Sequence, residues 1–260
     1  MNSETTGEAA AAGLFGLLDV VVKFAPGAWG QVSGHGTRLV MSDSLLGTFN
    51  GVFTSELEVD VETVAALAKE MAKEMIGVEL PWCVQTRAEP TPELLKVAAE
   101  HGLIIHHRSP LMVRDAGPVR PHRPDPDGPV VRRITGVEDQ MYVDLLAQGF
   151  ETSPEIFGEL MSAPVLDAPG VSAYLVEHGG EPVATGFGIL AAGLVGVYNI
   201  ATLPQFRTRG YGRLVTEAIL RDGFVAGATG AYLFTSELGQ PLYRSQGFEV
   251  VETWTYLMAE

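Results

Sequence analysis

The 260-residue sequence contains a single cysteine, Cys83, which excludes an intrachain disulfide. It has no apolar run of the roughly 18 to 20 residues that a membrane-spanning helix requires. The nearest candidate, residues 14–22, is too short and contains Asp19. The first twelve residues include Glu4 and Glu8 but no basic residue, so they lack the charged start of a secretory signal. We therefore expect a cytoplasmic protein.

Basic residues are also scarce: 17 Lys and Arg stand against 32 Asp and Glu, giving a net charge of −15. General nucleic-acid binding requires a basic surface that replaces counterions, so this class is excluded. The acidic excess promotes solubility and would also attract a cationic acceptor. With 46% hydrophobic and 19% charged residues, the composition is that of a folded globular chain.

A proline-rich segment divides the sequence at residues 116–129, AGPVRPHRPDPDGP. Proline at this density excludes the interiors of helices and sheets, so the segment is interpreted as a linker. We therefore predict a disordered, Ala-rich tail over 1–13, a smaller α/β domain over 14–115 and a second α/β domain over 130–260.

Both parts alternate between strand-like and helix-like patterns. In the first part the patterns predict strands at 38–41, 51–55, 82–85 and 104–113, and helices at 60–75 and 91–102. In the second they predict strands at 130–134, 171–176, 182–190, 194–203, 231–235, 248–251 and 253–258, and helices at 135–147, from 153, at 212–228 and at 240–245. The second part is therefore expected to form a mixed sheet with helices, and no clean sequence repeat relates the two parts.

The most informative segment, residues 203–213, reads LPQFRTRGYGR between a buried strand and an amphipathic helix. Gly210 and Gly212 permit a tight turn and close approach of the backbone to a ligand. Amides of such a turn, at a helix N-terminus, have the geometry that holds a pyrophosphate. The segment also contains three arginines, Arg207, Arg209 and Arg213. In an acidic chain these indicate an anionic partner, the alternative being a tight turn with solvated arginines.

This segment resembles the acetyl-CoA signature of the GNAT superfamily of N-acetyltransferases, a Gln/Arg-x-x-Gly-x-Gly/Ala turn after the fourth strand. The resemblance covers about residues 130–260 and implies the GNAT fold, a mixed sheet flanked by helices. Residues 200–204 resemble the end of that strand, whose backbone groups pair with the pantetheine arm, and Ser236 stands where many members place a small polar residue near the pantetheine. The implied acetyl-CoA-binding residues are Ile200, Ala201, Thr202, Arg207, Thr208, Arg209, Gly210, Tyr211, Gly212, Arg213 and Ser236.

Residues 241–248, PLYRSQGF, are similar to the family's last helix, in which a tyrosine commonly faces the CoA sulfur. The resemblance implies direct attack of an amine on the thioester. Tyr243 would then be the general acid that protonates the departing thiolate, and amides at the end of the 194–203 strand would stabilise the oxyanion. A purely packing role for Tyr243 is the alternative.

The general base stays open. An amine with a pKa of about 10 is mostly protonated at pH 7, so a base or a water relay must take its proton. Many family members carry a glutamate on the fourth strand, but residues 194–204 contain no acid. Glu177, His178 and Glu237 are candidates by position, although His178 resembles a solvated turn residue.

The first part resembles the degenerate GNAT-like N-terminal halves of some two-part bacterial members, on residues 80–82, 91–95 and 101–103. It lacks the glycine turn, so we expect it to bind no second CoA and to close one side of the acceptor pocket. His106 and His107 would point to opposite faces of a strand, so no metal site is expected.

The prediction is an acyl-CoA-dependent N-acetyltransferase that uses acetyl-CoA as cosubstrate, without nucleic-acid or membrane partners and with an oligomer permitted. The acceptor is expected to be a small molecule, and acetylation of a protein is the open alternative. The competing class is a non-catalytic acetyl-CoA-binding sensor or subunit. The absence of a strand glutamate favours that class, whereas Tyr243 argues against it.

Overall fold

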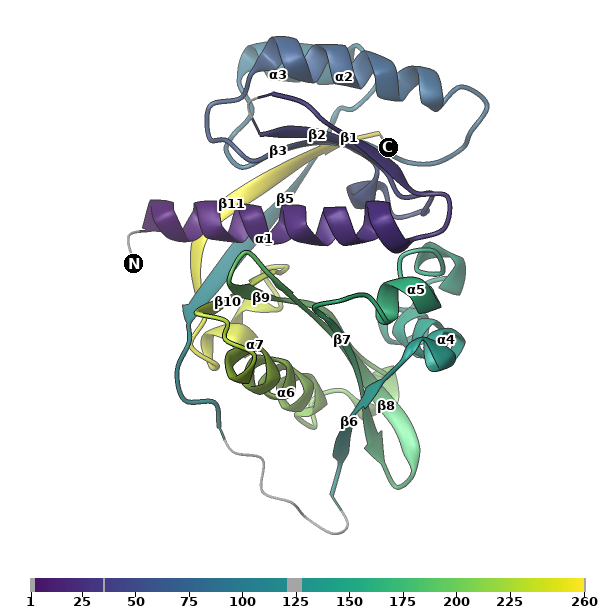
Figure 1. The fold of residues 1–260 in the computed structure, drawn as a ribbon, viewed down its shortest axis with the longest axis vertical. Coiled ribbons are helices and arrows are strands. Elements are labelled where there is room, and N and C mark those ends of the chain that lie inside the picture. Colours follow the sequence, from purple (N-terminus) through teal and green to yellow (C-terminus); the bar gives the residue numbers. More distant parts are fainter. Residues whose placement is uncertain (1–2, 35, 121–127, 260) are drawn as a thin grey trace.

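The computed structural model describes residues 3–34, 36–120 and 128–259, and the central part of the expected linker lies outside this range. Within it, one sheet runs through the whole molecule (Figure 1), in the order β1-β2-β3-β4-β11-β5-β10-β9-β8-β7-β6. Its strands are β1 Trp29–Val32, β2 Thr37–Met41, β3 Gly51–Thr54, β4 Cys83–Thr86, β5 Ile105–Asp115, β6 Val130–Ile134, β7 Val171–His178, β8 Glu181–Ala191, β9 Leu194–Thr202, β10 Gly230–Phe234 and β11 Glu249–Met258. The expected mixed α/β fold is confirmed.

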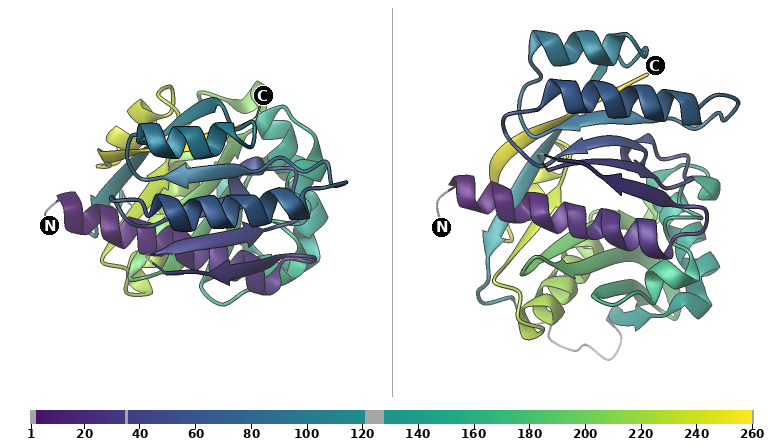
Figure 2. Two further views of the ribbon diagram at one scale, coloured as in Figure 1. Left: turned by 90° about the horizontal axis from the view of Figure 1, so that it is seen from above. Right: turned by 45° about the horizontal axis from the view of Figure 1, so that its top comes forward.

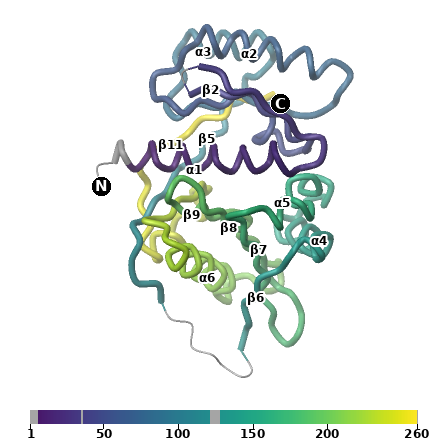
Figure 3. The backbone as a smooth tube through the Cα atoms, viewed as in Figure 1, coloured from purple at the N-terminus to yellow at the C-terminus, as the bar shows by residue number. Residues whose placement is uncertain are grey.

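The two halves of the chain exchange their last strands. Each half contributes one parallel pair, β3 with β4 and β9 with β10, and the other described neighbours are antiparallel. β5 leaves the N-terminal half to pair with β10, β11 leaves the C-terminal half to pair with β4, and the two also pair with each other. Figure 3 follows β11 up to the chain's C-terminus beside the N-terminal half. The halves therefore share one sheet, related by an approximate two-fold arrangement.

Seven helices in the described residues cover this sheet: α1 Ser3–Phe24, α2 Val61–Glu74, α3 Pro92–Ala99, α4 Asp139–Phe150, α5 Ala163–Leu166, α6 Tyr211–Val225 and α7 Gln240–Arg244. Short 3₁₀ turns add η1 Gly47–Phe49, η2 Gly136–Glu138, η3 Pro154–Ile156 and η4 Pro204–Phe206. Helices α2 and α3 lie side by side on the outer face of the N-terminal half (Figure 2). Helix α6 covers one face of β7, β8 and β9, while α1, α4 and α5 pack on the other. None of the helices in the described ranges combines the length and apolarity needed to cross a membrane.

The prediction of a disordered tail over 1–13 is wrong, because residues 3–13 belong to α1. Five apolar side chains recur along this helix at spacings of three and four and are buried: Ala10, Leu14, Leu17, Leu18 and Val21. Helix α1 lies against strands of both halves of the sheet (Figure 1). At Gly13 an added Cβ would stand 2.5 Å from Tyr232 Cε1, so glycine permits the close approach of helix and sheet. The spacing of this apolar stripe is visible in the sequence, and its burial against the sheet stabilises the helix.

Most other predicted elements are present, with three differences in the C-terminal half. The helix expected from residue 153 is only the turn η3, and the side chain of Ser153 makes no cap hydrogen bond to it. The helix expected at 135–147 begins as η2 and extends to Phe150. The strands expected at 248–251 and 253–258 are one strand, β11, with a β-bulge between Val250 and Glu252. A bulge bends a strand without ending it, which explains why the sequence pattern reads as two strands.

An ion pair ties the exchanged strand β11 to the N-terminal half. The Arg87 guanidinium, directly after β4, donates to both carboxylate oxygens of Glu252 at 3.1 and 2.6 Å and to the Ser55 carbonyl at 2.7 Å. The side chains are 2% and 13% exposed. Removal of one partner would leave a poorly solvated charge, so the pair opposes separation of the halves.

Candidate functional site

The parallel strands β9 and β10 pair only at their beginnings. Their registered partners are Leu194 with Gly230, Val195 with Ala231 and Gly196 with Tyr232. Beyond this point residues 197–202 pair with β8 alone, and residues 233–234 with β5 alone. The strands therefore diverge, and the backbone groups of β9 that face β10 lack a strand partner among the described residues. An extended ligand arm can pair with such an edge.

The turn after β9 delivers the chain directly to the N-terminus of α6. Thr208 has φ of 64° and Gly210, the N-cap residue, has φ of 88°. A Cβ added at Gly210 would meet nothing within 4 Å, so the space in front of the helix is open. The first amides of a helix have no partner inside it, and the helix dipole favours an anion there. The geometry is therefore that of an anion site at the mouth of the diverging strands.

The three arginines of the turn have different partners. Arg207 forms an ion pair with Glu151 at 2.8 Å and donates to the carbonyls of Thr202 and Gly149. It braces the turn against the end of α4. The prediction that Arg207 also contacts an anionic ligand stays a prediction.

The other two arginines lie closer to the helix N-terminus. Arg213 donates to Ser245 Oγ at 2.5 Å and has Glu217 at 4.0 Å. Arg209 donates to the Gln205 carbonyl and lies over the Phe206 ring, 5.3 Å from its centroid. Among the described residues Arg209 has no carboxylate partner, so its charge is available to an anion at the N-terminus of α6.

The remaining expected cofactor residues surround the same opening. Ile200 and Thr202 lie within 4.0 Å of the Cβ position at Gly212, whereas Ala201 packs on the other face against Gly149 of α4. Tyr211 is buried beneath the first turn of α6. Ser236 is exposed in the turn after β10, on the opposite side of the divergence.

Tyr243 lies on α7, which packs against the first turn of α6. Leu242 contacts the Cβ position at Gly212 at 3.6 Å, and Arg213 bonds Ser245 at the end of α7. The Tyr243 ring packs edge-on against Phe248, with centroids 6.0 Å apart. Burial raises the pKa of its phenol to about 12, so the hydroxyl is protonated at neutral pH.

The three candidate bases occupy different positions. Glu177 accepts from Arg132 at 2.6 Å near the outer edge of the sheet, two strands away from β9, and this pairing argues against a role as base. His178 is not a solvated turn residue: its ring lies 5.9 Å from that of Tyr211, and its Nδ1 is buried without a described partner. Glu237 is exposed in the turn beside Ser236.

A β-bulge in β9 marks a group of residues that the sequence analysis missed. Asn199 and Ile200 together stand opposite Gly186 of β8, and Asn199 has φ of 53°. The Asn199 side-chain amide donates to Met161 Sδ at 3.0 Å, on the face covered by α4 and α5. The Tyr142 hydroxyl of α4 lies beside Asn199. Local sequence patterns do not predict a bulge, because a bulge depends on the register between two strands.

The corresponding place in the N-terminal half is closed. At the ends of β3 and β4, Thr54 bonds both the side-chain oxygen and the carbonyl of Gln85, at 3.2 and 3.1 Å. At the N-terminus of α2 the carboxylate of Asp60 accepts from the Thr63 amide at 3.1 Å. A carboxylate there would repel an anionic ligand. The approximate symmetry therefore provides one open cleft and one closed counterpart.

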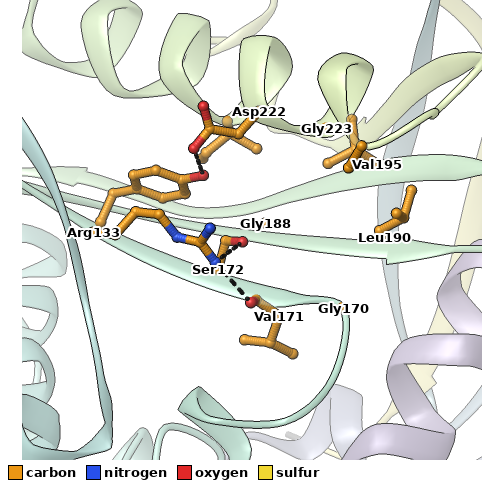
Figure 4. Close-up of a pocket in the computed structure, with 12 residues that line it drawn as sticks. Arg133, Gly170, Val171, Ser172, Gly188, Leu190, Val195, Asp222 and Gly223 are labelled. Atoms are coloured by element: carbon orange, nitrogen blue, oxygen red, sulfur yellow. Dashed lines mark hydrogen bonds between the residues drawn. The ribbon is translucent and has the colours of Figure 1, made fainter.

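A cavity of about 220 Å³ lies beneath the C-terminal part of α6, away from the glycine turn (Figure 4). Its polar groups bond one another: Tyr174 donates to Asp222 at 2.7 Å, and Arg133 donates to Ser172 Oγ at 2.7 Å. Because these polar groups already form hydrogen bonds with one another, they do not indicate a bound ligand in this cavity.

Comparisons with known proteins agree with this geometry. Residues 169–250 match the family described as Acetyltransferase (GNAT) domain. No curated protein matches the chain. Among solved structures, a GCN5-related N-acetyltransferase from Kribbella flavida is similar with a TM-score of 0.68 and 24% identity, over 97% of this chain and 95% of that one.

Two further structures share the fold at lower identity. A GCN5-related N-acetyltransferase from Sphaerobacter thermophilus has a TM-score of 0.58 and 16% identity, over 88% of this chain and 82% of that one. A putative GNAT-family acetyltransferase from Novosphingobium aromaticivorans has a TM-score of 0.54 and 18% identity, over 87% and 89%. The coverage shows that the shared fold includes both halves of the chain.

Proposed function

We propose that the chain is a member of the GNAT superfamily and transfers the acetyl group of acetyl-CoA to an amine, since residues 169–250 match the family described as Acetyltransferase (GNAT) domain. One observation carries the proposal: the cleft between β9 and β10 opens onto the N-terminus of α6. A ligand with an extended arm and a pyrophosphate fits a cleft of this form.

In this proposal the turn residues 208–213 hold the pyrophosphate through their amides, and Arg209 supplies positive charge. The backbone of Ile200, Ala201 and Thr202 pairs with the pantetheine arm, with Ser236 on the facing side. Arg207 supports the turn from behind, since its guanidinium is engaged by Glu151. The open space at Gly210 is consistent with close approach of a ligand.

The reaction would proceed by direct attack. The nitrogen of the neutral amine forms a bond to the thioester carbon, the C–S bond breaks, and the amine loses a proton to water. Amides at the bulge in β9 stabilise the oxyanion. Tyr243 donates its proton to the departing thiolate and regains one from solvent. The Tyr243 phenol is protonated at neutral pH and so holds the proton that this role requires, while its burial makes it a weaker acid than an exposed tyrosine.

The N-terminal half would close one side of the acceptor pocket. Ser44, in the loop before η1, donates to the Ile156 carbonyl of η3 at 2.7 Å, so the halves touch on the face covered by α4 and α5. A small-molecule acceptor suits a pocket between two halves of a chain. Acetylation of a protein is the alternative for the acceptor.

A thiol-release assay tests the proposal. Glycylglycine, glucosamine, benzylamine and spermidine serve as acceptors with acetyl-CoA. Thiol release that depends on an amine, with the acetylated amine detected by mass spectrometry, is the expected result. Binding of acetyl-CoA without amine-dependent release would instead support a non-catalytic sensor, which the absence of an acid on β9 favours.

A further inference from the structure

The bulge in β9 turns two successive side chains toward the same face of the sheet. Tyr198 packs with Phe187 and Tyr232 in the core beneath α1 and α4, and the next side chain, Asn199, reaches Met161 on that face. Ile200 then points toward α6. Without the bulge Asn199 would face α6, since strand side chains alternate. The bulge therefore places a half-buried amide on the face opposite the phosphate-binding helix, beyond the point where β9 and β10 diverge.

The backbone at Asn199 lies in the left-handed region, which asparagine adopts more readily than most residues other than glycine. Thr185 Oγ1 donates to the Asn199 carbonyl at 2.8 Å and thereby holds the bulge. The amide nitrogen is engaged by Met161, which leaves the side-chain oxygen as an acceptor.

A second observation points to a ligand at this place. Tyr142 is fully buried, and its hydroxyl lies beside Asn199 and Thr185, yet no described residue gives it a hydrogen bond of normal geometry. A buried hydroxyl without a partner is costly and calls for an explanation. Burial also raises the pKa of this phenol, so the group is uncharged.

We propose that Asn199 and Tyr142 form the subsite for the acceptor amine, with the Asn199 side-chain oxygen and the Tyr142 hydroxyl oxygen each accepting a hydrogen bond from an N–H group of the amine, so that the nitrogen lone pair stays free to attack. The inference rests on the proposed function, because it places the amine on the side of β9 opposite the phosphate-binding helix. Two uncharged polar groups suit the free base of an amine, since burial of an ammonium ion without a carboxylate is costly. The free base is also the nucleophilic form.

Because the Tyr142 hydroxyl has no described partner, we expect Tyr142→Phe to affect the Tm and the amine affinity differently. Because no described bond is lost, the Tm of the ligand-free protein should stay unchanged or rise, while amine binding should weaken about threefold to tenfold. The matched control is Tyr174→Phe, which removes a buried hydroxyl that does have a partner, Asp222. That variant should lower the Tm by about 2–4 °C and leave amine binding unchanged.

The variant Asn199→Gly distinguishes the contribution of the Asn199 side chain to amine binding from that of the bulged backbone. Glycine adopts the same positive φ without strain, so the bulge is kept and only the amide is lost. We expect this variant to weaken amine binding about threefold to tenfold and to bind CoA like the unmodified protein.

The test is calorimetric titration of the CoA-saturated protein with glycylglycine, glucosamine, benzylamine and spermidine. At least one amine should bind, and more weakly to Tyr142→Phe and Asn199→Gly. The inference is overturned if none of the four binds the unmodified protein, or if both variants bind amines as it does. A lower Tm for Tyr142→Phe with unchanged amine binding would assign that hydroxyl to structure alone. Failure of acetyl-CoA itself to bind is a different result, which overturns the proposed function.

Discussion

Thr54 donates its backbone amide to the side-chain oxygen of Gln85 at 3.2 Å, joining β3 and β4 where their counterparts β9 and β10 separate. The Gln85 side chain is fully buried, so it fills the space that stays open in the C-terminal half. The same sheet thus contains two parallel strand pairs that differ at their ends. Side-chain hydrogen bonds of Thr54 and Gln85 join β3 and β4, whereas β9 and β10 diverge toward the N-terminus of α6.

Gly210→Val should abolish acetyl-CoA binding without unfolding the protein, because the added side chain would occupy the open space before α6. The matched control is Gly227→Val at the other end of α6. Gly227 also has a positive φ and nothing within 4 Å of its Cβ position. Backbone strain should lower the Tm of both variants by a similar amount, but only Gly210→Val should lose acetyl-CoA binding. Calorimetry should give one acetyl-CoA per unmodified chain, and unchanged affinity in Gly210→Val would contradict the assigned site.

Tyr243→Phe should lower turnover about 10²–10⁴-fold and leave acetyl-CoA affinity nearly intact, because general acid catalysis typically contributes that factor. Steady-state kinetics with the best amine of the panel measures this. A fall of less than about threefold would assign Tyr243 to packing against Phe248. Tyr174→Phe serves as the control for loss of a phenol elsewhere around α6.

Buried tyrosines predict a loss of stability in alkali. Burial raises the pKa of six phenols, those of Tyr142, Tyr174, Tyr198, Tyr232, Tyr243 and Tyr256. In the unfolded chain a tyrosine titrates at about 10, so above that pH the unfolded state releases protons that the folded state keeps. Their contribution is complete below about pH 10 and is lost as the pH rises through the folded pKa, which is about 12 for Tyr243.

Each such group costs about 1.4 kcal/mol of stability per pH unit above its unfolded pKa. With six of them, we expect cooperative unfolding soon above pH 10. Thermal melts from pH 8 to 12, with tyrosinate absorbance recorded in parallel, would show unfolding and ionisation together. Ionisation of all phenols near pH 10 in a chain that stays folded would refute this.

A chain restricted to residues 128–260 should not fold by itself. It lacks β5, the strand between β10 and β11, so both would expose unpaired edges. Circular dichroism and proton NMR should show an unfolded or aggregated chain, and co-expression with residues 1–120 should restore the fold. A folded fragment that binds acetyl-CoA would instead support the separate domains over 14–115 and 130–260 that the sequence suggests.

Local signals account for what the sequence predicts well about the fold. Asp60 and Thr91 cap helices where their side chains bond the amides of Thr63 and Leu94. The run at 194–203, which is expected as a strand, becomes β9. Each of these depends on neighbours within a few residues. Helix α1 was missed although its apolar residues recur at helical spacing, and the strands that it packs against lie far away in the sequence.

The sequence by itself determined the turn from β9 to α6, because positive φ at Gly210 and a helix N-terminus are properties of a few adjacent residues. Only the tertiary structure decided how that turn is used. It assigned Arg207 to Glu151, closed the N-terminal cleft with Gln85, exchanged β5 with β11, and turned Asn199 toward Tyr142 through a bulge. Each of these contacts joins residues distant in the chain, and strand register and side-chain pairing over such separations leave no trace in local periodicity.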